Sequence, residues 1–268
     1  MDTVNWLTWN IPRWALMWGI AVTLFAAFKT ISFLGVRSPP APAGRKLAYL
    51  FLWPGMDAAA FLGRRPVLSP TPSEWGEALL KTATGIALLA LSRTADAPLL
   101  RGWIAMVGIL LSLHFGFFLG LSCFWRAQGI DAAPLMNRPL AATSVSAFWS
   151  RHWNTAFRDL TYYFVFRPLL RHAGARGAVL GTFMFSGLLH ELAITVPAGG
   201  GYGGPTLFFM LQGSAMILER SHRPSMIPKQ GWFFTQGLLV LTLPLLVLPP
   251  FVLRVINPFV DFLHGLVF

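Results

Sequence analysis

Long apolar runs that contain almost no charge constrain the fold of this sequence more than any other feature. A helix needs roughly 20 predominantly apolar residues to cross a bilayer, and only 12% of the 268 residues are charged. Six runs approach or reach that length, the second and fifth being short: 14–36, 77–92, 99–121, 176–197, 205–219 and 232–253. They lack the alternation of apolar and polar residues that barrel strands have. The sequence therefore predicts an all-α fold, a polytopic transmembrane helical bundle with about six spans, forming a single membrane-embedded domain over residues 1–268.

Basic residues outnumber acidic ones and flank the apolar runs. A net charge of +11 would suggest nucleic-acid binding in a soluble protein. Beside apolar runs it indicates contact with anionic lipid headgroups, so no nucleic-acid partner is expected. The loops 37–76, 122–175 and 220–231 carry five, six and three Lys or Arg, and the opposite loops carry three in total. By the positive-inside rule we expect an integral multi-pass protein of a bacterial inner membrane, with the 122–175 loop in the cytoplasm.

The segment 45–63 is apolar but interrupted. Pro54 and Gly55 break its helical pattern, and Asp57 would be costly in lipid. We therefore expect a re-entrant or interfacial helix here and not a seventh span.

Residues 147–164 have the pattern of an amphipathic surface helix. Aromatic side chains, Trp153 among them, recur at three- and four-residue steps, while Arg151, Asn154 and Arg158 share another face. One interpretation is an interfacial anchor, with tryptophans at headgroup level and arginines on lipid phosphates. The other is a docking surface for a soluble substrate that carries phosphates, which arginine binds well. Asn154 favours the second, because a neutral amide adds no lipid affinity but can orient a substrate carbonyl.

His190 lies in the apolar run 177–196, next to Glu191. An ionisable pair at membrane depth is expensive and is by default a candidate functional site. Ser186 lies one helical turn earlier and shares the face of His190, whereas Glu191 points about 100° away and is expected to bond a neighbouring helix. An imidazole shielded from water is neutral, the form in which a general base can take a proton from an alcohol that attacks an acyl group. The alternative is a histidine that only hydrogen-bonds another helix.

Several other chemistries lack their sequence patterns. A metalloprotease-type zinc site would need a histidine where Ile194 stands, so no metal is expected. The G-x-S-x-G pattern of a hydrolase serine is absent, and the single cysteine, Cys123, cannot form a cysteine-based cluster. A transporter or flippase that uses His190 and Glu191 as a polar relay stays open, although such pathways usually contain several intramembrane acids.

Two stretches resemble the membrane-bound O-acyltransferase superfamily: FWSRHWNTAFRDLTYYFVFRPL at 148–169, followed by FSGLLHEL at 185–192. WPGMD at 53–57 and MNRPL at 136–140 are similar to its wax synthase branch. His190 matches the histidine of the family and Asn154 matches its asparagine, which makes these two the candidate catalytic residues. The candidates for substrate binding come from the amphipathic segment 147–164 and from the helix face of His190. They are Arg151, Arg158, Trp153 and Ser186.

The resemblance also implies the partners of the reaction. Acyl-CoA would be a co-substrate, with no separate cofactor, and a long-chain alcohol would be the acceptor, so that the products are wax esters. Another hydroxyl acceptor, such as a sterol, diacylglycerol, terpenoid or glycan, stays open. Because the chain has fewer spans than many relatives, a homo-oligomer also stays open.

Overall fold

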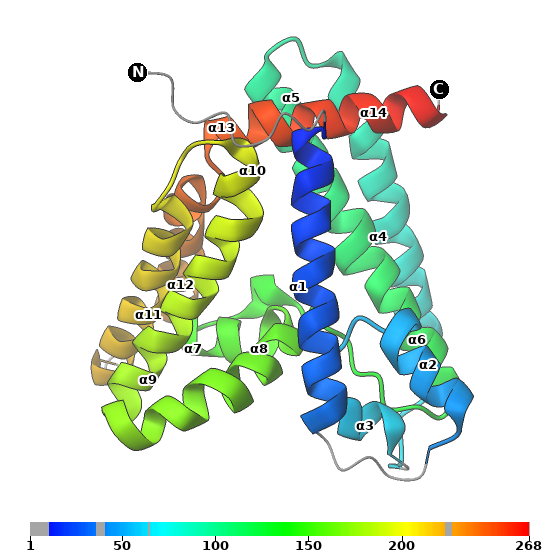
Figure 1. The fold of residues 1–268 in the computed structure, drawn as a ribbon, viewed down its shortest axis with the longest axis vertical. Coiled ribbons are helices and arrows are strands. Elements are labelled where there is room, and N and C mark those ends of the chain that lie inside the picture. Colours follow the sequence, from blue (N-terminus) through cyan, green and yellow to red (C-terminus); the bar gives the residue numbers. More distant parts are fainter. Residues whose placement is uncertain (1–10, 36–40, 64, 223–226, 268) are drawn as a thin grey trace.

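The computed structural model describes residues 11–35, 41–63, 65–222 and 227–267, and the regular elements in these ranges are all helical. The long helices stand roughly parallel in two groups with α1 between them, and α14 lies across one end (Figure 1). The long helices are α1 (Arg13–Gly35), α4 (Pro72–Leu91), α5 (Pro98–Ile109) continued by η2 (Leu110–Phe117) and α6 (Phe118–Ala127), α9 (Arg167–His190), α11 (Gly204–His222) and α12 (Pro228–Leu246).

Shorter elements gather at the two ends of the long helices (Figure 1). Those between α1 and α9 are α2 (Ala43–Leu52), α3 (Ala58–Leu62), η1 (Ser92–Thr94), η3 (Pro139–Ala141), α7 (Val145–Ala147), η4 (Phe148–His152), α8 (Thr155–Thr161) and η5 (Tyr162–Phe166). Those that follow α9 are η6 (Glu191–Thr195), α10 (Val196–Ala198), α13 (Pro249–Phe251), η8 (Val252–Ile256) and α14 (Asn257–Val267).

The described residues contain fewer clear spans than the six that we expected. Three stretches are long and apolar enough to cross a membrane, Arg13–Gly35, Pro98–Ala127 and Thr155–Ala198, and the pair Pro228–Leu246 and Pro249–Leu266, bent by 60°, makes a fourth if it counts as one span. The short runs 77–92 and 205–219 do form helices, within α4 and α11. Both helices contain too many polar residues to count as clear spans.

The polarity of these two helices has simple causes. The first half of α4 contains Glu74, Glu77 and Lys81. In α11, Gln212 and Glu219 interrupt the apolar sequence, and both are buried inside the protein. The all-helical prediction is confirmed, while the count of six spans is not reached in the described part of the chain.

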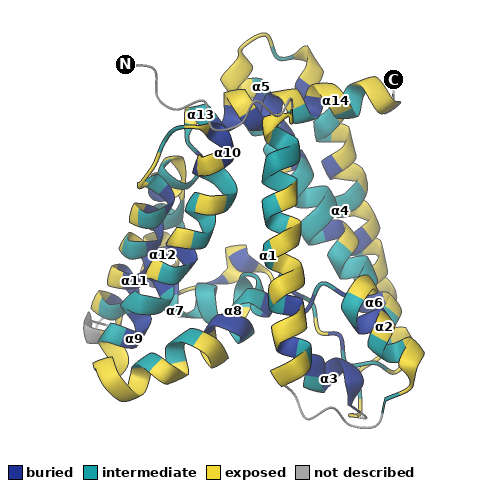
Figure 2. Ribbon diagram, viewed as in Figure 1, coloured by how far each residue is buried: buried dark blue, intermediate teal, exposed yellow. Residues whose placement is uncertain are grey.

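Buried apolar side chains form three clusters, and one of them supports the site described below. The first joins α2 and α3 to α6, and the second joins α5 to α10 and η8. The third lies between α9 and α11, where Phe183 packs with Phe208, Phe209 and Met216. Figure 2 shows the buried residues where helices meet and the exposed ones on the outward faces.

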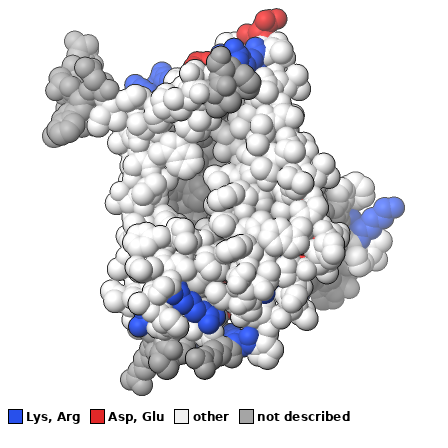
Figure 3. Space-filling view, turned by 90° about the vertical axis from the view of Figure 1, so that its right-hand side faces the viewer, with Lys and Arg blue, Asp and Glu red and all other residues white. Residues whose placement is uncertain are grey.

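The outward faces are largely apolar. Large exposed side chains include Val22, Leu79, Phe233 and Leu241. Figure 3 shows one face of the molecule on which the middle belt is almost free of charge, with charged side chains lying mainly toward the upper and lower edges. Such a belt is typical of a surface that faces lipid. The side of the membrane on which each loop lies stays a prediction.

The interrupted segment 45–63 forms no span, as predicted. It contains α2 and α3, of 10 and 5 residues, and the chain between them is extended at Trp53. Asp57 lies at the start of α3, where its Oδ1 accepts a hydrogen bond of 2.9 Å from the backbone N–H of Ala60. The carboxylate that argued against a span is therefore a helix cap.

Lys29 of α1 holds this segment in place. Its side chain is only 2% exposed, and its Nζ donates to the carbonyl oxygen of Trp53 at 2.8 Å and to that of Gly55. The Nζ atom also lies 3.4 Å from the centroid of the Tyr49 ring. Burial raises the pKa of Tyr49 to about 12, so its phenol stays protonated and bonds with Ser32 Oγ at 2.9 Å.

Replacing Lys29 by methionine should destabilise the protein. The change keeps the length of the side chain but removes the donor of the two buried carbonyls, and leaving a buried carbonyl without a partner costs about 1–3 kcal/mol. We expect a clear fall in the denaturant midpoint measured in detergent micelles. The control is Lys46→Met on α2, a half-buried lysine that forms no ion pair with another described residue. Equal midpoints for the two variants would show that Lys29 does not anchor the segment.

Candidate active site

The predicted surface helix over 147–164 is wrong in one respect: it is broken in the middle. η4 ends at His152, Trp153 is extended, and Asn154 adopts the left-handed conformation with φ 40° before α8 begins. Asn tolerates this conformation better than most residues. Its Oδ1 also accepts a 3.2 Å hydrogen bond from the N–H of Phe157 and so caps α8. Consequently, residues on the two sides of Asn154 do not share one helical face.

The turn at Asn154 is held by the segment that contains MNRPL. The N–H of Asn137 donates to the carbonyl of His152 at 2.9 Å, and the N–H of Thr155 donates to the carbonyl of Leu135 at 3.0 Å. The N–H of Asn154 itself contacts Met136 Sδ at 3.3 Å. Two motifs that are separate in the sequence therefore form one structural unit around the turn.

The two arginines that we expected on one helix face, Arg151 and Arg158, have different surroundings. Arg151 is exposed. Arg158 donates from Nη1 to the carbonyl of Ser150 at 2.8 Å and forms an ion pair with Asp159. The charge of Arg158 is therefore partly balanced within the protein.

His190 is positioned by its own helix and by α11. The long helical stretch that carries it bends at Gly174, whose φ of 64° suits glycine. Before the bend, α8 and the start of α9 run along one end of the molecule, and after it α9 runs toward the other end (Figure 1). At the far end of α9, His190 Nδ1 lies 2.7 Å from the carbonyl oxygen of Ser186. The ring centroid of Phe209, on α11, is 4.5 Å from that of His190.

The bond to Ser186 determines which ring nitrogen can act. A carbonyl oxygen only accepts hydrogen bonds, so Nδ1 of His190 carries the hydrogen. Nε2 is then the nitrogen with a free electron pair, as a general base requires. The hydroxyl of Ser186 donates to the carbonyl of Thr182 at 3.0 Å, so its backbone is what contacts the histidine.

Glu191 bonds a neighbouring helix, and that prediction is confirmed. Its Oε1 accepts hydrogen bonds from the N–H and the hydroxyl of Thr206, at 3.1 and 2.9 Å. Its Oε2 accepts one of 2.7 Å from Thr195. The carboxylate thus ties the end of α9 to the start of α11 beside His190.

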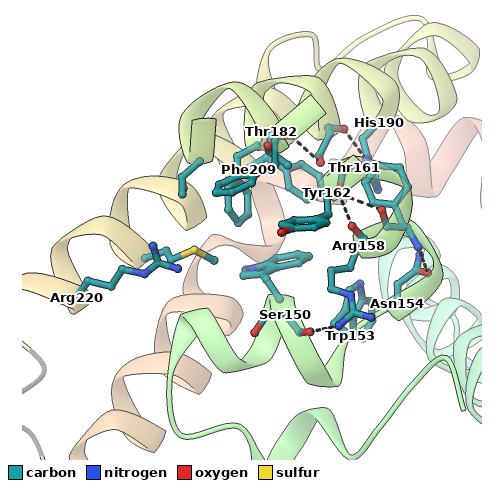
Figure 4. Close-up of a pocket in the computed structure, with 17 residues that line it drawn as sticks. Ser150, Trp153, Asn154, Arg158, Thr161, Tyr162, Thr182, His190, Phe209 and Arg220 are labelled. Carbon is teal, nitrogen blue, oxygen red and sulfur yellow. Dashed lines mark hydrogen bonds between the residues drawn. The ribbon is translucent and has the colours of Figure 1, made fainter. Parts of the chain in front are cut away.

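A cavity of about 430 Å³ brings most of the predicted residues together. His190, Asn154, Arg158, Trp153 and Ser186 line it, and Arg151 is not among its lining residues. The remaining wall is rich in aromatic residues and comes from η4, α8, η5, α9 and α11 (Figure 4). The other lining residues are Trp149, Ser150, Phe157, Thr161, Tyr162, Phe166, Val179, Thr182, Phe183, Phe209, Met216 and Arg220.

Sequence reasoning missed the contribution of α11. Glu219 is 4% exposed, and its carboxylate accepts hydrogen bonds from the N–H groups of Val145 and Ser146 at 3.0 and 3.2 Å. It thereby holds the start of the segment that leads to Asn154. An acidic residue at the edge of an apolar run was the available signal. Arg220, which follows it, had no signal, since its place depends on how α11 packs against α9.

Comparison with known proteins identifies the segment that forms this site. Residues 132–211 match the model of the membrane bound O-acyl transferase family, and they include both the Asn154 turn and His190. This segment is similar to that family. The matched segment also carries the MNRPL motif that holds the turn.

Curated relatives of the chain have names that describe acyl transfer. The chain is 36% identical over 129 residues to a probable long-chain-alcohol O-fatty-acyltransferase 8 of Arabidopsis thaliana, covering 42% of this chain and 38% of the relative. It is 35% identical over 103 residues to the long-chain-alcohol O-fatty-acyltransferase of Simmondsia chinensis, covering 32% and 29%. An acyl-CoA–sterol O-acyltransferase 1 of Arabidopsis thaliana is 34% identical over 70 residues, covering 24% and 20%. The chain spans about two fifths or less of the length of these relatives.

Proposed function

We propose that this chain is a membrane-embedded O-acyltransferase that moves a fatty acyl group from acyl-CoA to the hydroxyl of a lipid-soluble alcohol, forming wax esters from long-chain alcohols. The observation that carries the proposal is the meeting of His190 and Asn154 in one aromatic cavity, although 35 residues separate them in the chain. The names of the relatives support this reaction class. The aromatic wall offers an apolar environment for a fatty chain.

The proposed step needs only one base. Nε2 of His190 takes the proton of the alcohol hydroxyl while the alcohol oxygen attacks the carbonyl carbon of the thioester. A C–O bond forms, the C–S bond breaks, and the thiolate of CoA leaves with the proton that the imidazolium returns. A positioned base contributes about 10²–10⁴-fold to such a reaction, and orientation of the two substrates contributes more.

Asn154 has a place for both of its amide atoms in this scheme. Its Oδ1 is engaged in the cap of α8. Its Nδ2 is a donor on a residue that lines the cavity, and we propose that it hydrogen-bonds the thioester carbonyl, where negative charge develops during attack. The left-handed backbone of Asn154 explains in addition why an ordinary residue would fit this position poorly.

Substitutions of Asn154 can separate the amide from the turn. Asn154→Asp retains a cap acceptor and tolerates the left-handed backbone, but it removes the N–H donor. We expect ester formation to fall by about 10²-fold, the usual effect of losing one donor to a developing oxyanion. Asn154→Gly, which also keeps the backbone, should lose a similar factor. The readout is labelled ester formed in membranes supplied with acyl-CoA and alcohol.

The control for this series is Asn137→Asp. The side chain of Asn137 is exposed, and this variant should retain activity. If Asn154→Asp is as active as wild type, Asn154 is only a cap and the donor role is wrong.

A sterol acceptor is the second candidate, because one relative is named as a sterol acyltransferase. Membranes given labelled acyl-CoA with a panel of long-chain alcohols, a sterol and diacylglycerol would distinguish the acceptors. Release of the CoA thiol is measured in parallel. Movement of lipid without thiol release would contradict acyl transfer and favour a transporter or flippase. A homo-oligomer stays a prediction that crosslinking in membranes would test.

A further inference from the structure

Arg220 is a cation at the end of the cavity opposite to the candidate catalytic pair. Figure 4 shows Arg220 on one side of the cavity and His190 and Asn154 on the other. Met216, four residues earlier on α11, also lines the cavity, together with several aromatic side chains. The cavity thus has a cationic end and a catalytic end with an apolar wall between them, an arrangement suited to a long substrate that carries an anionic group.

The charge of Arg220 is available to a ligand in the cavity, which is not so for Arg151 or Arg158. Arg220 is exposed and forms no ion pair within the described residues. The adjacent Glu219 does not neutralise it, because that carboxylate is buried and accepts two backbone hydrogen bonds. By contrast, Arg158 pairs with Asp159, and Arg151 does not line the cavity.

The distance between the two ends matches a known chemical spacer. Phe209 contacts the ring of His190, and Arg220 follows Phe209 by eleven residues on the same helix, α11. At the rise of an α-helix this separation is about 16 Å. The pantetheine arm of CoA joins the thioester sulfur to the first phosphorus through about 13 bonds, which at the rise of an extended peptide chain span about 15 Å.

We propose that Arg220 binds the phosphate at the end of the pantetheine arm of acyl-CoA, so that the arm lies along α11 and delivers the thioester to His190. The assignment rests on the proposed function for its substrate, and it replaces Arg151 and Arg158 as the main phosphate contact. A guanidinium suits this task because it can donate two hydrogen bonds to one phosphate.

Binding measurements test the assignment without requiring catalysis. The full chain is placed in nanodiscs of phosphatidylcholine, and the dissociation constants of CoA, 4′-phosphopantetheine and pantetheine are measured by titration calorimetry. Arg220→Gln should weaken binding of CoA and 4′-phosphopantetheine by about ten-fold or more, the effect of losing a hydrogen bond to a charged group. Binding of pantetheine, which lacks the phosphate, should not change. Arg220→Lys should recover part of the loss.

The matched control is Arg171→Gln, an exposed arginine of α9 outside the cavity lining, and it should bind all three ligands as wild type does. Equal losses for pantetheine and 4′-phosphopantetheine would overturn the assignment, because Arg220 would then act on the structure and not on the phosphate. An equal loss in Arg171→Gln would overturn it as well, since the effect would be one of general surface charge. If addition of anionic phosphatidylglycerol to the nanodiscs abolishes the difference between Arg220→Gln and wild type, the guanidinium serves a lipid headgroup and the assignment fails.

Kinetics separate this inference from the proposed function. In ester formation, Arg220→Gln should raise KM for acyl-CoA with little change in kcat, and it should leave the reaction of a phosphate-free S-acyl pantetheine unaffected. If wild type forms no ester but binds CoA in a manner that depends on Arg220, the transferase proposal is wrong and the phosphate contact stands. If wild type forms ester and Arg220→Gln is unchanged with both donors, the transferase proposal stands and the phosphate contact of Arg220 is wrong.

Discussion

Membranes containing His190→Ala are expected to form ester about 10²–10⁴-fold more slowly than wild type, the range that a positioned general base contributes. The imidazole lines the cavity, and its Nδ1 is committed to the carbonyl of Ser186, so that Nε2 is left for the substrate. Initial rates with saturating acyl-CoA and alcohol measure the effect on kcat. Binding of CoA should persist, because the proposed phosphate contact lies at the other end of the cavity.

A second histidine of a membrane helix provides the control. His114 lies in η2, packs edge-on against Phe118 with centroids 5.3 Å apart, and does not line the cavity. His114→Gln should therefore retain most of the activity. Unchanged ester formation by His190→Ala, in a variant that still binds CoA, would reject the role of His190 as the base.

Gly187→Leu is expected to cause the largest structural loss of activity. A Cβ atom at Gly187 would lie 2.7 Å from the Cα of Thr206, which is backbone and cannot turn aside. The added side chain would separate α9 from α11, breaking the bonds between Glu191 and Thr206 and moving Phe209 away from His190. Overpacking of this kind costs about 1–3 kcal/mol, and a 1 Å misplacement near the chemistry can cost about 10²-fold in rate. Thermal unfolding in detergent and ester formation measure the two effects.

The control glycine lies in the same helix group. Gly237 of α12 has no atom within 4 Å of the position that a Cβ would occupy, so Gly237→Leu should behave as wild type in both measurements. If Gly187→Leu retains its stability and its activity, the close approach of α9 and α11 does not position the site. If Gly237→Leu is equally impaired, the loss reflects insertion into the membrane and not helix packing.

Most helices were predictable from the sequence because apolar periodicity acts locally, but the run 232–253 was not one helix: α12 ends at Leu246, and the chain bends by 60° before the next helix. Pro54 and Gly55 indicated the interruption between α2 and α3, and the structure confirms that this segment is no span. The number of spans was harder to predict. Inside the protein, Gln212 bonds Thr242 at 2.9 Å and Glu219 bonds two backbone amides, so that polar residues are accommodated in a helix that hydropathy alone had assigned to lipid.

The residues of the candidate site were also predictable only in part. His190 and Asn154 stood out because an ionisable group in an apolar run and an amide beside arginines are costly or unusual in lipid. The prediction that Arg151 and Arg158 share one helix face was wrong. Helical spacing assumes an unbroken helix, and Asn154 interrupts it with a left-handed turn. That turn is held from residues 135–137, a contact that no local pattern reveals.

By itself the sequence determined the helical, membrane-embedded class of this protein and its two most unusual polar residues, since both follow from local transfer energies of side chains. The tertiary structure decided what those residues face. The register of α11 against α9, set by backbone contact at Gly187, places Phe209 beside His190 and Arg220 at the far end of the cavity. Register depends on contacts between segments that are distant in the chain, and these have no signature in either segment alone.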